Sequence, residues 1–193
     1  MVKDEDAYIR AFKRIDDDDD VLPYPEHLRY VFAYLSSKAQ SMVILKYRAD
    51  HWILFYTEMI IGQVISNNID EFKYIAWPAR INIDIMKSIL YRGRVDFLHF
   101  LLNTRDYDNG IITKLMDEAV VASEGRIDPS ITKYMIELGY PPGRFINIDQ
   151  SQVHHQHGLI RDIDEFNFGK MTTDQIVDYL YANDFLKIPH PSD

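Results

Sequence analysis

The sequence contains no cysteine. This absence excludes disulfide frameworks, thiolate nucleophiles and thiolate zinc sites, and it fits a reducing compartment, so we expect a cytoplasmic protein. The most apolar window, residues 52–65, is interrupted by Glu58 and Gln63 and is shorter than the roughly 20 residues needed to cross a bilayer. The first ten residues include three acidic side chains and no apolar run, unlike a secretory signal. We therefore expect residues 52–65 to form a buried helix and the protein to bind no membrane.

Positive charge is in the minority, because 21 Lys and Arg stand against 30 Asp and Glu, for a formal net charge of -9. This balance repels phosphate backbones, so we expect no nucleic acid as a partner. The sequence also lacks the glycine-rich signatures of phosphate loops, dinucleotide-binding folds and nucleophile elbows. We therefore predict that the protein is not an enzyme and binds no cofactor.

Apolar residues are abundant, at 47% of the 193 residues, with 13 Tyr and 10 Phe, which is enough for one folded domain. Five consecutive aspartates, residues 16–20, precede Pro23 and Pro25. Like charges repel and prolines stop helices, so residues 1–22 are predicted to be an acidic arm or linker. Residues 23–186 are predicted to form a helical repeat domain, and residues 187–193 a C-terminal tail.

Helix patterns and their stop signals follow one another closely in the second half of that domain. Apolar residues at helical spacing predict helices over residues 41–67, with a break near Asp50, and over residues 83–91 and 95–102. Gly93 lies between the last two, where a left-handed glycine ends a helix. A similar arrangement follows with helices over residues 113–122 and 129–138.

The boundaries of the later helices also have recognisable signals. Asp128 is a predicted N-cap with Pro129 at the first helical position, and Gly139 is a predicted stop. Asn109-Gly110 is typical of a tight turn with positive φ. Thr172 to Gln175 is typical of a capping box.

Two internal alignments indicate a repeat. Residues 68–75 align with residues 94–101, and residues 131–140 align with residues 176–185. The successive offsets are uneven, at 26, 34 and 45 residues, and only the middle one is close to the roughly 33-residue period of ankyrin repeats. Helix, turn, helix and connecting turn in succession are typical of a repeat protein.

These segments resemble a degenerate array of ankyrin repeats. Residues 93–102 have the spacing of that family's glycine turn and outer helix, and residues 128–140 resemble the end of one repeat. The resemblance covers residues 60–140 well and residues 162–186 weakly. The Thr-Pro-Leu-His signature is absent, and residues 113–116 stand where it belongs. Such eroded arrays are most similar to those of large DNA viruses and some intracellular bacteria. A viral origin would place the protein in the host cytoplasm.

The fold is therefore predicted to be all-α, with stacked helix-pair repeats. The alternative is an irregular helical bundle in a single domain. An ankyrin-like array implies a binding surface for another protein, whose identity the sequence does not specify.

His154, His155 and His157 are the candidate metal ligands, because three imidazoles within four residues can share a zinc or nickel ion. A fourth ligand from Asp162 or Asp164 would complete such a site. We favour an exposed polar loop for this stretch, because no glutamate follows in the arrangement of zinc proteases. His99 lies within an apolar run, and we expect it at the edge of the core rather than in a catalytic site.

Three functions follow from these patterns. The first is a protein-protein interaction module without catalysis. The second is a structural component of a viral or other assembly. The third is a small metal-dependent enzyme that uses the histidine cluster at residues 154–157.

Overall fold

The computed structural model describes residues 29–30, 32–33, 52–76, 81–104, 108–146 and 168–190. Within these ranges the protein is all-α, as predicted, with eight α-helices and no strand. One isolated parallel bridge joins Arg126 to Lys187. The helices are α4 (Trp52–Ser66), α5 (Ile69–Ile75), α6 (Ile83–Tyr91), α7 (Val95–Asn103), α8 (Asn109–Ala122), α9 (Pro129–Glu137), α10 (Gly143–Ile146) and α12 (Thr173–Ala182), and one 3-10 turn, η2 (Phe168–Lys170), precedes α12.

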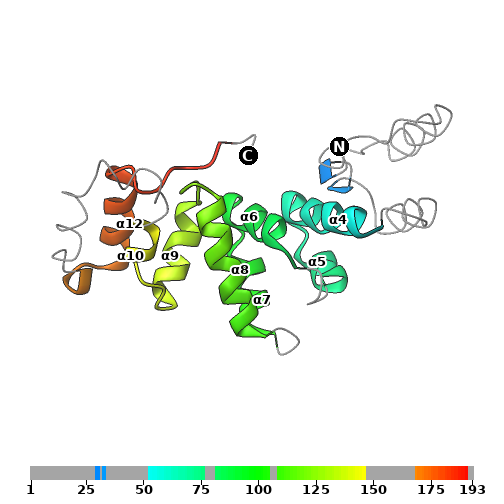
Figure 1. The fold of residues 1–193 in the computed structure, drawn as a ribbon, viewed down its shortest axis with the longest axis horizontal. Coiled ribbons are helices and arrows are strands. Elements are labelled where there is room, and N and C mark those ends of the chain that lie inside the picture. The colour runs from blue at the N-terminus through cyan, green and yellow to red at the C-terminus, as the bar shows by residue number, and fades with distance from the viewer. Residues whose placement is uncertain are drawn as a thin grey trace.

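The helices form an elongated body with α4 and α5 at one end and α12 at the other (Figure 1). Helix α6 packs against both α4 and α8, and α7 packs against both α5 and α9. Contacts also join α4 to α5, α6 to α7, and α9 to α12. The packed pairs therefore include consecutive helices, such as α4 and α5, and helices two apart, such as α6 and α8, and the core runs along the body between them.

Helix α4 is buried on every side over residues 58–64, and the buried set includes the polar residues Glu58 and Gln63. Met59, Ile60, Ile61 and Val64 are all buried, so no stripe of this helix faces solvent over that turn. The prediction of a helix over residues 52–65 is thus confirmed, and its burial is confirmed over residues 58–64. Within the described ranges, no helix is both long enough and apolar enough to span a bilayer.

Helix α6 begins and ends where the sequence predicts. The side chain of Asn82 caps it by accepting the Ile85 N–H at 3.0 Å, and the helix buries Ile85 and Ile89 on its apolar face. Gly93 follows with φ 64°, so the left-handed conformation predicted there is confirmed. The next helix, α7, ends at Asn103, one residue beyond the prediction.

Helix α9 has the predicted signals at both ends. Asp128 caps it by accepting the Ser130 N–H at 2.9 Å, and Pro129 takes the first helical position. Gly139 has φ 89° and donates its N–H to Ile136, while Tyr140 donates its N–H to Met135. These two hydrogen bonds form a Schellman motif, which satisfies carbonyls that the helix end leaves open.

The predicted tight turn at Asn109-Gly110 is wrong. Helix α8 begins at Asn109, four residues before the prediction, and Gly110 lies within its first turn. The cause is Asp108, whose carboxylate accepts the N–H groups of Gly110 and Ile111 at 2.7 and 3.4 Å. An N-cap at Asp108 satisfies these donors and starts the helix, so Asn109 and Gly110 adopt helical geometry instead of a left-handed turn.

Helix α12 opens with the predicted capping box. Thr172 accepts the Gln175 N–H at 3.3 Å, and the Gln175 side chain accepts the Thr172 N–H at 2.9 Å. After this helix the chain turns back, and Lys187 forms backbone hydrogen bonds with Gly125 and Ile127 at 2.8 and 3.2 Å. The boundaries proposed at residues 22 and 186 stay predictions.

Candidate binding site

The histidines proposed as metal ligands, His154, His155 and His157, lie outside the described residues, as do Asp162 and Asp164. The metal hypothesis therefore stays a prediction. Among the residues that the structure describes, no group of three or more His, Asp or Glu side chains is arranged to hold a metal ion.

His99 lies on the exposed face of α7, at the edge of the core, as expected. Its Nδ1 is 2.8 Å from the hydroxyl of Tyr134 on α9, and the two rings lie 6.1 Å apart. Asn103, one turn later on α7, donates to the His99 carbonyl at 2.8 Å. These contacts join α7 to α9 at the surface and account for the position of His99 without a ligand.

The adjacent carboxylates Asp117 and Glu118 serve different neighbours, because consecutive helical residues face different directions. Asp117 accepts from the Tyr140 hydroxyl and from the Arg144 guanidinium, each at 2.7 Å. Glu118 lies 3.8 Å from Lys114 on the exposed side. Burial, together with the hydrogen bond to Asp117, raises the pKa of Tyr140 well above its ordinary value. The Asp117 cluster therefore attaches the chain after α9 to α8.

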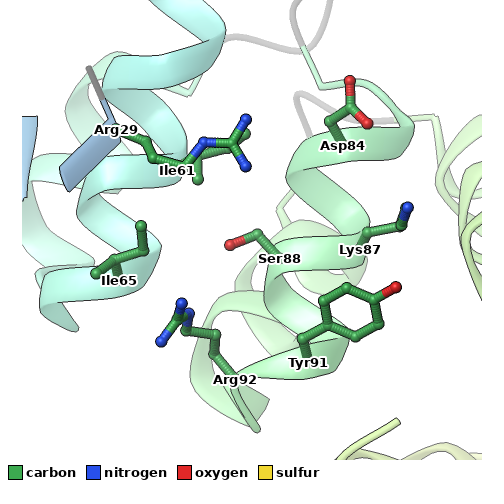
Figure 2. A pocket seen from close by; sticks show the side chains of 8 residues that line it. All are labelled: Arg29, Ile61, Ile65, Asp84, Lys87, Ser88, Tyr91 and Arg92. Carbon is green, nitrogen blue, oxygen red and sulfur yellow. The ribbon is translucent and has the colours of Figure 1, made fainter. Parts of the chain in front are cut away.

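A small cleft between α4 and α6 is the candidate site that the sequence did not indicate (Figure 2). Its cavity volume is about 90 Å³. Residues at helical spacing form its walls, from α4, from α6 and from the helical segment that contains Arg29. The lining consists of Arg29, Ile61, Ile65, Asp84, Lys87, Ser88, Tyr91 and Arg92.

The cations of this cleft differ in how they are balanced. Arg29 forms a bidentate pair with Glu58, whose oxygens lie 2.7 and 3.0 Å from its guanidinium nitrogens. Glu58 is 6% exposed, so this pair is largely removed from water. The ammonium of Lys87 lies 5.7 Å from the centre of the Tyr91 ring. Neither cation is therefore isolated.

Arg92 is the exception in the part of the chain that the structure describes, since its half-buried guanidinium makes no hydrogen bond and no ion pair there. Arg94 lies close enough for the two charges to interact. The Arg94 guanidinium donates to the carbonyls of Val64 and Ile65 at 2.9 and 3.1 Å, at the end of α4. Burial is the largest cause that lowers the pKa of Arg94, and the charge of Arg92 lowers it further.

The cleft can hold an anionic group by charge and hydrogen bonding. Figure 2 shows Ser88, on α6, and Arg92, just after the end of α6, pointing into the space that faces Ile65 of α4. A guanidinium and a hydroxyl are both donors to a carboxylate or phosphate oxygen. The spacing of Lys87, Tyr91, Ser88 and Arg92 along one helix was visible in the sequence, but Arg29 and α4 become neighbours only through the fold.

Comparison with known proteins found no family model, no curated protein and no solved structure that matches this chain.

Proposed function

We propose that the chain is a protein-protein interaction module built from stacked helix pairs, similar to a degenerate ankyrin array. In this proposal the pairs are α4 with α5, α6 with α7, and α8 with α9. The first helices would form one row and the second helices another. The packing of α6 on α4 and α8, and of α7 on α5 and α9, supports this arrangement.

Hydrogen bonds between successive turns are the observation that carries the proposal. Arg94, after α6, donates to the end of α4 at Val64. The Asp128 N–H, before α9, donates to the carbonyl of Leu90 at the end of α6, at 3.0 Å. The Lys187 N–H in turn donates to the carbonyl of Gly125. Each turn is thus bonded to the turn of its neighbour, as a stack of similar units requires.

Backbone conformation supports the same register. Asn67 and Gly93, 26 residues apart, both have positive φ after the first helix of a proposed pair. Gly139 and Asp184, 45 residues apart, both have positive φ after α9 and α12. The two offsets, 26 and 45 residues, equal those of the alignments made from the sequence alone, so the turns recur at the same spacing as the aligned segments.

A stack of this kind supports binding because each unit contacts only its neighbours and leaves a long surface open. Large apolar side chains are exposed on it, including Tyr74 on α5 at 79% and Ile111 on α8 at 59%. Tyrosine is a common anchor in protein interfaces because its ring is both apolar and hydrogen bonding. The two rows would offer two different faces to a partner.

Site-specific photo-crosslinking tests the proposal. A benzophenone amino acid is placed at Tyr74 on α5 or at Lys114 on α8, one position for each row, and the protein is irradiated in its native cells. Both positions are exposed, so the fold should tolerate the change. We expect one row to give a discrete adduct with another protein, and excess untagged protein should abolish it.

Three results bear on this interpretation in different ways. Adducts from one row only would locate the binding face. Adducts that excess untagged protein does not reduce would reflect random collisions and contradict a specific interface. An absence of adducts from both rows would contradict the proposal, provided that circular dichroism shows each labelled protein to be helical.

A further inference from the structure

The cleft between α4 and α6 concentrates positive charge on an acidic protein. Arg29 is balanced by Glu58, so two further cations, Lys87 and Arg92, stand against one carboxylate of the lining, Asp84. The whole chain has a formal charge of -9. Nearby charges dominate the local field because salt screens distant ones over about 10 Å. The cleft is therefore an attractive position for an anion on a molecule that otherwise repels anions.

Arg92 adds a reason to expect an anion there. In the described part of the chain its guanidinium has donors to offer and no acceptor, and it is half-buried beside a second arginine, Arg94. Removing a charge from water without a partner is unfavourable, and a like charge nearby makes it more so. An oxyanion in the cleft would offset both costs. Ser88, one turn earlier on α6, supplies a hydroxyl to the same space.

We propose that this cleft binds the carboxylate of a glutamate or aspartate side chain in an extended segment of the protein partner. This assignment rests on the proposed function, because it names the chemistry by which the module recognises its partner. Arg92 would bind the carboxylate, Ser88 would donate to it, and Lys87 would add to the positive potential of the cleft. The methylene groups of the side chain would pack on Ile61 and Ile65.

Size and charge favour a carboxylate side chain over a nucleic acid. A volume of about 90 Å³ is well below the roughly 300 to 1,000 Å³ of sites for drug-sized ligands, and it suits a single side chain. Asp84 would repel the double charge of a phosphate monoester more than the single charge of a carboxylate. A nucleic acid would bring many phosphates close to a surface whose net charge is -9.

Nuclear magnetic resonance titration of the full chain tests the assignment. The probe is a blocked alanine peptide with one central glutamate, and the matched probe has glutamine in its place. We expect saturable shifts of the backbone amides of residues 84–92 with the first probe. The glutamine peptide should bind roughly fivefold more weakly or not at all, as expected for the loss of one partly screened ion pair.

Two pairs of variants locate the binding. Arg92→Gln should lower the affinity for the glutamate peptide by roughly fivefold. Arg126→Gln makes the same change of charge in the α8–α9 turn and should leave that affinity unchanged. Lys87→Gln and Lys170→Gln form a second pair, since Lys170 is exposed in η2, outside the cleft lining. Unperturbed amide spectra outside α6 would show that each variant is folded.

Competing ligands give the outcomes that would overturn the assignment. In one such outcome, inorganic phosphate or a thymidine decamer shifts the amides of residues 84–92 and binds with higher affinity than the peptide. That result would assign the cleft to phosphate or nucleic acid instead. Equal binding of the glutamate and glutamine peptides would remove the role of the carboxylate. Equal losses in Arg92→Gln and Arg126→Gln would show a diffuse charge effect and no site.

The two proposals can fail separately. If the peptide does not bind while a partner still crosslinks to α5 or α8, the cleft assignment fails and the interaction module stands. If the peptide binds in the cleft and no partner crosslinks, the carboxylate site is supported and the proposed module is contradicted.

Discussion

The turn between α6 and α7 and the turn after α9 use the same backbone conformation in different surroundings. Gly93 has φ 64° and Gly139 has φ 89°. A Cβ added at Gly93 would lie 2.7 Å from the carboxyl carbon of Asp128 and 3.0 Å from the Ser130 hydroxyl. In the described part of the chain, a Cβ added at Gly139 would meet no heavy atom within 4 Å.

The difference separates two reasons for a glycine at the end of a helix. At Gly139 only the left-handed conformation requires it. At Gly93 there is also no room for a side chain, because Asp128 lies close to the Gly93 backbone. Asp128 caps α9 there, and its N–H donates to the carbonyl of Leu90. Gly93 therefore lies in the contact between two proposed helix pairs, whereas Gly139 only ends helix α9.

The largest expected effect is that of substituting Gly93. Gly93→Ala should destabilise the protein by about 2 kcal/mol, and Gly93→Val by more, because the new side chain is strained at positive φ and displaces the Asp128 cap. Urea unfolding followed by circular dichroism measures the change. If Gly93→Ala stabilised the protein, Gly93 would lie in a continuous helix and the turn would be wrong.

A double-mutant cycle with Asp128 sharpens this result. Asp128→Ala alone should cost about 1 kcal/mol, the typical loss of an N-cap. In the Asp128→Ala background, Gly93→Ala should cost about 1 kcal/mol less than in the natural chain, because the cap has already been lost. Additive effects would show that Gly93 and Asp128 do not interact.

The next largest effect concerns Arg94, which joins the same turn to the preceding pair. Arg94→Ala should destabilise the protein by about 1.5 kcal/mol, since two carbonyls at the end of α4 lose a charged donor. Thermal unfolding at low and high salt measures it. Arg126→Ala is the matched control in the α8–α9 turn, where Arg126 forms an exposed ion pair with Glu124 at 3.8 Å, and this change should cost less.

Local signals predicted much of the central fold. The boundaries of α6 were predicted to the residue, because an apolar stripe and a glycine stop agree there, and the structure adds the Asn82 cap at its start. The start of α8 was predicted wrongly, because Asn109-Gly110 is a strong turn signal in isolation. Asp108 competes for the same backbone N–H groups and starts a helix instead. Two local preferences conflicted, and the sequence did not indicate which would prevail.

The candidate cleft could not be predicted in the same way. Its walls come from residues more than 50 positions apart, Arg29 and Lys87, so their proximity depends on how the helices pack. The spacing of Ser88 and Arg92 showed only that they share one face of a helix. Charged residues at helical spacing usually indicate a solvated helix face. This face of α6 becomes one wall of a cleft only because α4 lies opposite it.

A smaller effect is expected at Tyr140, which follows Gly139 and attaches its turn to α8. Burial raises the pKa of Tyr140 above its ordinary value, so its hydroxyl stays neutral in the folded protein. Tyr140→Phe should cost about 1 kcal/mol at pH 7, because the hydrogen bond to Asp117 is lost.

The pH dependence of this variant has a definite sign. Unfolded tyrosine ionises near pH 10, and the folded group does so only at higher pH, so the contribution of Tyr140 is complete below about pH 10 and is lost above it. The stability difference between Tyr140→Phe and the natural chain should therefore shrink as pH rises above about 10. Denaturant melts at pH 7, 9 and 11 would measure it, and a constant difference would contradict the raised pKa.

The smallest expected effect is at Gly139, where only backbone conformation is at stake. Gly139→Ala should cost about 1 kcal/mol, and Gly139→Asn only about 0.5 kcal/mol, because asparagine tolerates the left-handed region better than alanine does. Asp184 supports this expectation, since it occupies the corresponding position after α12 with φ 58° and is not a glycine. Urea unfolding of both variants, in parallel with Gly93→Ala, would measure the three losses in the free energy of unfolding under one set of conditions. If Gly139→Ala cost as much as Gly93→Ala, the close approach of Asp128 would contribute nothing, and the two turns would differ only in their neighbours.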